Sequence, residues 1–342
     1  MKLLVTGGAG FIGSNFIHYM LQSHEDYEIV NVDALTYCGN LDNLRGLENV
    51  ANYRFIKGRI EDEEFIDKLF WRERFDIVVN FAAETHVDRS LMNPKMFLTT
   101  NILGTQTLLE ASCKYGVKRY HQVSTDEVYG ELPLEDVTKK FCEDSRICPS
   151  SPYAVSKASS DMLVLSYGRS FGLLVTISRC SNNYGPYQFP EKLIPLVISR
   201  AENNQQIPIY GDGKNVRDWL YVEDHCRAID LILQEGKIGE VYNIGGNNEY
   251  SNLELVTLIL ETLNKPQELI TFTQDRKGHD RRYAICPDKI EQKLGWKPSY
   301  TFEQGIKKTI TWYQEHNEWM NKLLNQDYQK FFAAINPELS QE

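Results

Sequence analysis

The sequence KLLVTGGAGFIG, residues 2–13, decides the fold. Its apolar beginning, Lys2–Thr6, predicts a short β-strand, and the apolar spacing over Phe11–Leu21 predicts a helix. Glycines at positions 7, 8, 10 and 13 fill the turn between them. A side chain at such positions would hold the backbone away from a pyrophosphate, whose charge is stabilised by the amides at the start of the helix. The stretch therefore predicts a dinucleotide-binding loop.

An acidic residue ends the second predicted strand, Glu28–Asp33. A carboxylate at this place can accept hydrogen bonds from the hydroxyls of an adenosine ribose, and its charge repels a 2′-phosphate. Asp33 therefore predicts NAD, rather than NADP, as the cofactor.

Strand and helix patterns alternate along the chain. Further strands are predicted at 53–57, 77–81, 119–123, 173–178 and 241–244, and helices at 95–115 and from 153 to about 170. This alternation predicts an α/β fold with a Rossmann-type doubly wound parallel sheet. The alternation of strand and helix patterns ends from Asn182 on, so we expect a smaller, interleaved α/β substrate domain. The first domain is expected to span 1–180, with the chain returning near 218–245, and 181–330 to form mainly the second.

Composition narrows the partners and the compartment. The 342 residues carry 37 Lys and Arg against 47 Asp and Glu, a net charge of −10, and no basic stripe, so nucleic acid is not an expected partner. No apolar stretch reaches the roughly 18 residues of a membrane span, and the N-terminus lacks a signal-peptide pattern, so we expect a cytoplasmic protein without membrane attachment. The seven cysteines form no C-x-x-C pair, which predicts free thiols and no metal site.

Tyr153 and Lys157 lie four residues apart, which places both side chains on one face of a predicted helix. A nearby ammonium favours the phenolate, so Lys157 is expected to lower the pKa of Tyr153 toward the range of a general base. Ser124 and Thr125 follow an earlier predicted strand, at the sheet edge where ligands bind in such folds. A hydroxyl there can bind the substrate oxygen that the tyrosine deprotonates.

The glycine loop, the hydroxyl residue and the Tyr/Lys pair together resemble the extended short-chain dehydrogenase/reductase family, over nearly the whole chain. Many members use a retained NAD to oxidise a nucleotide sugar. The resemblance implies that Tyr153 removes the proton of the C4 hydroxyl, and that Lys157 tunes Tyr153 and holds the nicotinamide ribose. It also implies that Thr125 binds the C4 oxygen.

Two carboxylates, Asp126 and Glu127, follow Thr125 directly. Once C4 of a sugar is oxidised, the C5 proton is acidic and the C6 hydroxyl is a β-leaving group. Its elimination needs a base and an acid, roles that two carboxyls in different environments can divide. The segment STDEVYG, residues 124–130, is similar to the signature of the dTDP-glucose 4,6-dehydratases.

That similarity implies a lyase that converts dTDP-D-glucose to dTDP-4-dehydro-6-deoxy-D-glucose for the biosynthesis of a deoxysugar of the rhamnose type. Glu127 would take the C5 proton, and Asp126 would protonate the leaving C6 hydroxyl. Hydride would return to C6, so that a tightly bound NAD is regenerated in each cycle.

Other segments carry the same resemblance: 35–40, with Cys38 in place of the usual Ala, 82–90, with Thr85 in place of the usual Ser, 181–187, 217–225 and 275–285. The cofactor positions that it implies are Gly7, Gly10, Phe11, Ile12, Gly13, Asp33, Ala34, Leu35, Thr36, Ile60, Ala82, Ala83, Thr100, Tyr153, Lys157 and Asn183. The substrate positions are Thr85, Thr125, Asn182, Lys192, Leu193, Pro208, Tyr210, Arg217, Asn252, Arg276 and His279. The resemblance also implies a homodimer formed through the helices near 95–115 and 153–170.

One position departs from the family pattern. Arg59 stands where the family usually has an Asp near the adenine amine, and a guanidinium cannot accept that hydrogen bond. Either Arg59 stacks on the adenine face, or Asp62 takes over the contact.

Two other functions are weighed against dehydration. A nucleotide-sugar 4-epimerase or decarboxylase of the same family would keep the fold, but such relatives generally lack the Asp126–Glu127 pair. A catalytically inactive NAD-binding scaffold is disfavoured because Thr125, Tyr153 and Lys157 are all present. The preferred nucleotide base and the final deoxysugar are left open.

Overall fold

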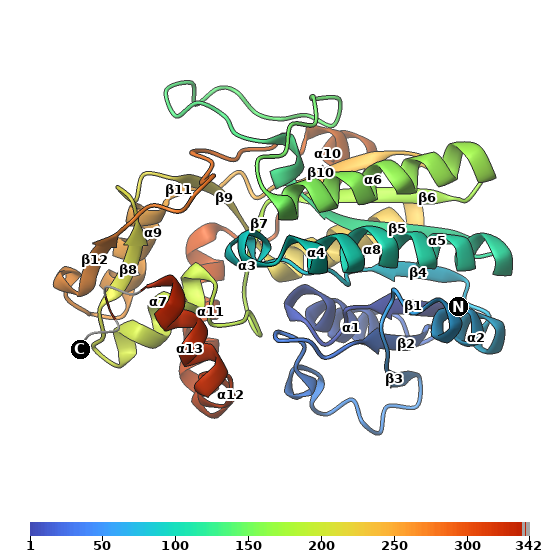
Figure 1. Cartoon of the computed structure of the whole chain (residues 1–342), viewed down its shortest axis with the longest axis horizontal. Helices are drawn as coiled ribbons and strands as arrows, with labels where there is room; N and C mark the ends of the chain where they lie inside the picture. The colour runs from blue at the N-terminus through green and yellow to red at the C-terminus, as the bar shows by residue number, and fades with distance from the viewer. Residues whose placement is uncertain (337–338, 340–342) are drawn as a thin grey trace.

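The computed structural model describes residues 1–336 and 339. Within them, seven parallel strands form one sheet in the order β10-β6-β5-β4-β1-β2-β3 (Figure 1). The strands are β1 (Lys2–Thr6), β2 (Glu28–Asp33), β3 (Tyr53–Lys57), β4 (Ile77–Asn80), β5 (Arg119–Thr125), β6 (Val175–Cys180) and β10 (Val241–Ile244).

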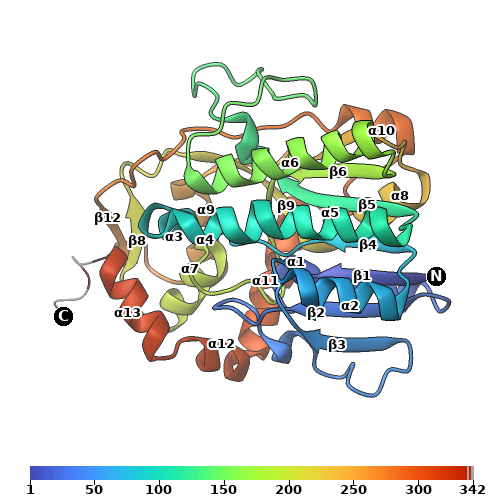
Figure 2. The ribbon, with the colours of Figure 1, turned by 45° about the vertical axis from the view of Figure 1, so that its right-hand side comes forward.

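Helices cover both faces of this sheet because side chains alternate along each strand. Leu3 and Val5 of β1 pack on the face covered by α1 (Phe11–Ser23) and α8 (Val222–Glu235). Leu4 packs on the opposite face, against residues of α2 (Glu63–Glu73), α5 (Gly104–Tyr115) and α6 (Pro152–Phe171), and Figure 2 shows these three helices in front of the strands. The predicted doubly wound α/β fold is confirmed.

Two strands reach further toward the carboxyl edge of the sheet than the sequence predicts. β5 extends from the predicted end at Val123 to Thr125, and β6 spans Val175–Cys180 instead of 173–178. The reason is pairing: Val123, Ser124 and Thr125 lie in register with Ser178, Arg179 and Cys180. Polar residues therefore continue a buried ladder here, and they bring Thr125 to the end of its strand.

The helix predicted over 95–115 is present but not uniform. It consists of α4 (Pro94–Phe97), the π-helical turn η2 (Leu98–Leu103) and α5, and the short α3 (Val87–Met92) precedes it. It ends where predicted, with Gly116 at a φ of +71°, a conformation that favours glycine. π-helical turns are frequent at functional sites, and Thr100 lies in this one.

A second region forms beyond the end of β6. It holds a three-stranded sheet of β7 (Asn182–Tyr184), β9 (Val216–Tyr221) and β11 (Glu249–Ser251), and the pair β8 (Ile207–Tyr210) and β12 (Ile270–Thr273). The helices around them are α7 (Leu193–Glu202), α9 (Asn252–Thr262), α11 (Phe302–Glu315), α12 (Asn317–Leu323) and α13 (Gln326–Ile335). Capping boxes at Ser251–Glu254 and Thr301–Gln304 fix the starts of α9 and α11.

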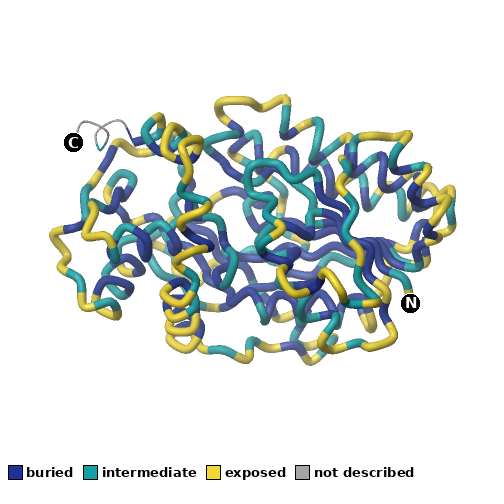
Figure 3. Tube along the Cα trace, turned by 90° about the horizontal axis from the view of Figure 1, so that it is seen from below, coloured by how far each residue is buried: buried dark blue, intermediate teal, exposed yellow. Residues whose placement is uncertain are grey.

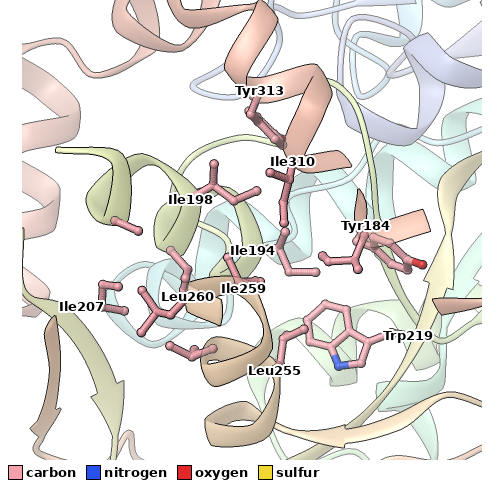
Figure 4. Packing of buried hydrophobic residues seen from close by; sticks show 14 of the residues in the cluster. Tyr184, Ile194, Ile198, Ile207, Trp219, Leu255, Ile259, Leu260, Ile310 and Tyr313 are labelled. Carbon is pink, nitrogen blue, oxygen red and sulfur yellow. The ribbon is translucent and has the colours of Figure 1, made fainter. Parts of the chain in front are cut away.

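This region has its own hydrophobic core (Figure 4). Ile194 and Ile198 of α7, Leu255 and Ile259 of α9 and Tyr313 of α11 meet there. The core holds α7 and α9 in place at one side of the site described below.

Shorter elements complete the fold: η1 (Leu41–Leu44), η3 (Asp126–Tyr129), η4 (Gln267–Leu269) and α10 (Asp288–Leu294). The C-terminal helices return to the first part of the chain, where the indole nitrogen of Trp319 donates to Asn43 Oδ1 at 2.8 Å. Burial is concentrated along the strands, and exposed residues lie on the outer turns (Figure 3). No helix in the described residues combines the length and the apolar character needed to cross a bilayer.

Candidate active site

The carboxyl ends of the central strands open onto two adjoining pockets. The glycine-loop pocket is lined by Gly7, Gly10 and Gly13, which follow β1, by the ends of β2 and β5, and by Tyr153 of α6. The arginine pocket is lined by Arg217, Arg276 and residues of α13. The residues that line both pockets define the junction between them; they are Glu127, Asn182, Asn183, Gln188, Glu191 and Lys192.

The glycine loop leaves room for an anion at the start of α1. A Cβ at Gly13 would lie 2.4 Å from the carbonyl oxygen of Gly7, and Gly7 itself has a φ of +71°. Gly10 precedes α1, and no side chain caps the amides of its first turn. Backbone N–H groups therefore face the pocket unblocked, as a pyrophosphate site requires. These features fit the expected NAD.

Asp33 lies at the end of β2 with both carboxylate oxygens held by the backbone. The amide of Ala9 donates to Oδ2 at 3.0 Å, and the amide of Leu35 donates to Oδ1 at 2.7 Å. Burial raises the pKa of Asp33, while these two hydrogen bonds lower it. The carboxylate is thus fixed at the pocket wall, where a ribose is expected.

Most of the other predicted cofactor positions also line the glycine-loop pocket. They are Gly7, Gly10, Phe11, Ile12, Gly13, Ala34, Thr36, Ile60, Ala82, Ala83, Thr100, Tyr153, Lys157 and Asn183. Leu35 is not among the lining residues: it has a φ of +52° and packs on the core beneath β1. Only the backbone amide of Leu35 contributes to the site, by donating a hydrogen bond to Asp33 Oδ1.

The structure distinguishes the two candidates for the adenine contact. Arg59 lines the glycine-loop pocket, and its guanidinium lies 3.0 Å from Glu61 Oε1. Asp62 instead caps α2, where Oδ1 accepts from the amide of Phe65 at 3.0 Å. Arg59 therefore lies in the glycine-loop pocket, whereas Asp62 is not among its lining residues.

Tyr153 and Lys157 lie on the first turns of α6, beside the end of β5. Ser151 caps this helix, and Pro152 occupies its first position. The Lys157 ammonium donates to the carbonyl oxygen of Val123 at 2.7 Å, which ties α6 to β5. Both side chains are buried and line the glycine-loop pocket.

The predicted lowering of the Tyr153 pKa by Lys157 is not found. Burial raises the pKa of Tyr153 well above its ordinary value, and the negative charge of Glu127 raises it further. The hydrogen bond with Thr125 acts in the opposite direction. Burial and the charge of Glu127 therefore outweigh any effect of Lys157 on the pKa of this phenol.

The acid pair occupies two different environments. Burial raises the pKa of Asp126 well above its ordinary value, and Glu127 and Asp218 raise it further. Burial also raises the pKa of Glu127, but three cations lower it, Arg276 most strongly, then Lys192 and Arg217. Asp126 therefore holds its proton more firmly, and Glu127 is the carboxyl that ionises more readily.

The arginine pocket concentrates cationic and aromatic groups. Arg217 is buried, with its guanidinium 4.1 Å above the ring of Tyr283 and a hydrogen bond to the carbonyl oxygen of Asp280 at 2.9 Å. Arg276 Nη1 lies 3.8 Å from Asp88 Oδ2, and its buried Nε has no hydrogen-bond partner among the described residues. An anionic ligand such as a diphosphate would satisfy that donor.

The predicted substrate positions come together around these two pockets. Asn182, Lys192, Leu193, Pro208, Tyr210, Arg217, Asn252, Arg276 and His279 line the arginine pocket, while Thr85 and Thr125 line the glycine-loop pocket. His279 Nδ1 donates to Asp275 Oδ1 over 2.7 Å, and burial lowers the pKa of its imidazole to about 4. The ring is therefore neutral at pH 7.

Among the lining residues that sequence reasoning missed are Glu191 and three aromatic residues of α13. Glu191 lies at the junction and directly precedes Lys192, which was predicted. The position next to Lys192 could therefore have pointed to Glu191. Tyr328, Phe331 and Phe332 of α13 line the arginine pocket, although the polar and aromatic composition after Asn321 gives no functional pattern. In the described residues, no group of His, Cys, Asp and Glu side chains is arranged to hold a metal ion, and the seven cysteines are unpaired.

Comparison with known proteins agrees with this geometry. Residues 4–309 match the family described as GDP-mannose 4,6 dehydratase. The dTDP-glucose 4,6-dehydratase of Salmonella typhimurium is 47% identical, over 97% of this chain and 98% of that protein. The crystal structure of the enzyme of that name from Bacillus anthracis, in complex with NAD, is 50% identical with a TM-score of 0.88, over 94% of this chain and 99% of that one.

The dTDP-glucose 4,6-dehydratase structure from Streptomyces venezuelae, with NAD and TYD bound, is 45% identical. It matches with a TM-score of 0.90, over 94% of this chain and 100% of that chain. The chain therefore belongs to the NAD-dependent epimerase/dehydratase family, among the dTDP-glucose 4,6-dehydratases.

Proposed function

We propose that this chain dehydrates dTDP-D-glucose to dTDP-4-dehydro-6-deoxy-D-glucose, with NAD as its resident cofactor, at the junction of the two pockets. The relatives named above carry this activity in their names, and two of their structures contain NAD. One observation carries the assignment of residues. Asp126 and Glu127, next to Thr125 and Tyr153, lie in environments that push their pKa values apart.

The first step is oxidation at C4 of the sugar. Thr125 binds the C4 oxygen, and Tyr153 takes the proton of the C4 hydroxyl. Lys157, fixed to Val123, orients α6 so that the phenol meets Thr125. NAD, when bound, supplies the hydride acceptor for C4 and later the hydride donor for C6.

The second step is loss of water across C5 and C6. Glu127, which three cations help to ionise, accepts the C5 proton. Asp126, whose pKa is raised by burial well above its ordinary value, gives its proton to the leaving C6 hydroxyl. Two carboxyls with separated pKa values thus divide the roles of base and acid. Hydride return to C6, together with return of a proton from Glu127 to C5, gives the 4-keto-6-deoxy sugar.

The nucleotide occupies the arginine pocket in this proposal. Arg217 and Arg276 hold the diphosphate, for which the unpartnered Nε of Arg276 is available. Lys192 adds positive charge at the junction, where its ammonium lies 3.5 Å from the carbonyl oxygen of Thr85. Leu193, Pro208, Tyr210 and Asn252 would then surround the base.

Incubation with dTDP-glucose tests the proposal and its alternatives. A dehydratase gives a 4-keto product that absorbs in alkali, whereas a 4-epimerase gives the galactose epimer and an inactive scaffold gives neither. The acid pair favours the first outcome. Turnover on the dTDP-, UDP-, GDP- and CDP-glucoses would establish the preferred base, and recovery of the epimer alone would contradict dehydration.

The proposal includes the division of the chain into domains. We assign cofactor binding to residues 1–180, with the chain returning near 218–245, and substrate binding mainly to 181–330.

The proposal also includes the oligomeric state and the cellular location. A homodimer through α5 and α6 is supported by exposed apolar side chains on this side, namely Leu98, Leu103, Val155 and Met162. Seven unpaired cysteines are consistent with the proposed cytoplasmic location.

A further inference from the structure

The C-terminal helix α13 contributes to the site from the far end of the chain. It lies beside α7 in Figure 1. There the Arg200 guanidinium carbon is 4.7 Å from the centre of the Phe332 ring. The hydroxyl of Tyr328 donates to the carbonyl oxygen of Pro190 at 3.3 Å. Pro190 immediately precedes Glu191, so α13 is anchored directly at the junction between the two pockets.

Phe331 of α13 forms one side of an aromatic sandwich around Arg89 of α3. The Arg89 guanidinium carbon is 3.9 Å from the centre of the Phe331 ring and 3.9 Å from the centre of the Tyr37 ring. A planar guanidinium can stack on two rings at once, which an ammonium cannot do. The sandwich joins three segments that are remote in the sequence: the loop after β2, α3 and α13.

The clamped arginine holds the buried carboxylate of Glu191. Arg89 Nε lies 3.3 Å from Glu191 Oε2, and the Glu191 side chain is only 2% exposed. On the other side, His86 Nε2 lies 4.0 Å from Oε1. The His86 ring packs edge-on against Phe331, with centroids 5.5 Å apart. Glu191 is therefore held in place by groups that themselves depend on Phe331.

We propose that Phe331 is a positioning residue for sugar binding: it fixes Arg89, and Arg89 fixes the Glu191 carboxylate at the junction of the two pockets. This inference rests on the proposed function, because the sugar of dTDP-glucose would lie at the junction, between the acid pair and the diphosphate site. It makes α13 part of the substrate site.

The test is a double-mutant cycle with Phe331→Leu and Arg89→Lys. Leucine keeps apolar bulk but removes the ring, and lysine keeps the charge but removes the planar group. Each single change should raise KM for dTDP-glucose about tenfold, the loss of one desolvated cation–π contact, with kcat changed less than about threefold. The double variant should also show a KM about tenfold above the wild-type value, because both changes break the same contact.

Binding of dTDP alone serves as the second readout. Since dTDP lacks the sugar, its Kd should rise less than about threefold in the same variants. Gln329→Ala, an exposed position on α13, is the matched control and should leave KM unchanged. Bound NAD, measured after denaturation, and the thermal midpoint report whether each variant is folded.

Three results would overturn the inference: an unchanged KM in Phe331→Leu, a multiplicative loss of about a hundredfold in the double variant, or a dTDP Kd that rises in parallel with KM. The same cycle can be read as the Kd of dTDP-glucose by calorimetry. If the Kd of dTDP-glucose is unchanged in the Phe331→Leu and Arg89→Lys variants while the wild-type protein dehydrates dTDP-glucose, only the inference is refuted. A wild-type protein that binds dTDP-glucose without dehydrating it refutes the proposed function instead.

Discussion

The Lys157 ammonium donates to the carbonyl oxygen of Val123 at 2.7 Å, and Val123 lies two residues before Thr125 on β5. This contact joins the helix that carries Tyr153 to the strand that carries the hydroxyl residue. The geometry of the oxidation site is thus fixed by a backbone acceptor, which substitution of a neighbouring side chain would not remove.

Tyr153→Phe should abolish the first oxidation. Without the phenol, the C4 hydroxyl has no proton acceptor, so turnover should fall by about 10²–10⁴-fold. Rapid mixing with dTDP-glucose should then show no rise in the absorbance of reduced nicotinamide. A rise at the wild-type rate would remove Tyr153 from the first step.

The acid pair should be dispensable for oxidation but not for elimination. Glu127→Gln and Asp126→Asn should still form reduced nicotinamide on mixing, yet release about 10²–10⁴-fold less dehydrated product. In heavy water, the Glu127→Gln variant should also fail to exchange the C5 hydrogen, because the base is gone. Dehydration at nearly the wild-type rate by Glu127→Gln would exclude the pair from the mechanism and revive the epimerase alternative.

The pH dependence of dehydration should be bell-shaped, and Arg276 should set its acid side. Glu127 works ionised, so activity falls as the pH drops through its pKa. Burial raises that pKa and Arg276 lowers it, so Arg276→Ala should raise it and move the acid limb to higher pH.

Asp126 works protonated and its pKa is raised, so the alkaline limb should remain in the Arg276→Ala variant. The same change should raise KM through the lost diphosphate contact. An acid limb that stays in place, measured as kcat against pH, would argue against the coupling of Arg276 to Glu127.

Asp33 should select NAD over NADP. Both carboxylate oxygens are fixed by backbone amides, so the negative charge cannot turn away from a 2′-phosphate. Reconstitution of the cofactor-free protein should therefore favour NAD, and Asp33→Ala should narrow the ratio of the two affinities. Equal or tighter binding of NADP by the wild-type protein would refute this role.

The ion pair between Asp161 and Arg179 should matter for stability. Its atoms are 2.9 Å apart, and the side chains are 0% and 3% exposed. Asp161→Asn leaves the guanidinium buried without a counter-charge, which should lower the free energy of unfolding by about 3–5 kcal/mol. Asp67→Asn, in an exposed pair with Lys114, is the matched control and should leave the denaturation midpoint unchanged. A similar response of both variants to urea would contradict the expectation.

The sequence pattern correctly predicted elements whose limits depend only on neighbouring residues in the chain. β1 begins and ends at the predicted residues because an apolar run is bounded by the glycine loop. The continuation of β6 beyond Ser178, through Arg179 and Cys180, was not predicted, since these residues pair with β5 on one side and with β10 on the other. The pattern of a single segment does not contain those partners.

In the site, too, residues within recognisable segments were predicted, whereas features that depend on contacts between segments were not. Motif residues such as Arg217 and Arg276 line the predicted pocket, because their segments carry recognisable patterns. The raised pKa of Tyr153 depends on burial and on Glu127, which the four-residue spacing to Lys157 does not describe. The stacking of Phe331 on Arg89 joins distant parts of the chain, and neither segment alone indicates it.

The order of strands also has a consequence for synthesis on the ribosome. The edge strand β10 and the covering helix α8 come late in the chain, yet they complete the sheet that begins at Lys2. Phe16 and Ile17 of α1 share their core with Cys226 and Ile229 of α8. The nascent N-terminal half therefore emerges with this face of its sheet covered by α1 but not by α8, and it completes the face only after α8 has left the exit tunnel. Completion of this face therefore waits until translation has passed Glu235, the end of α8.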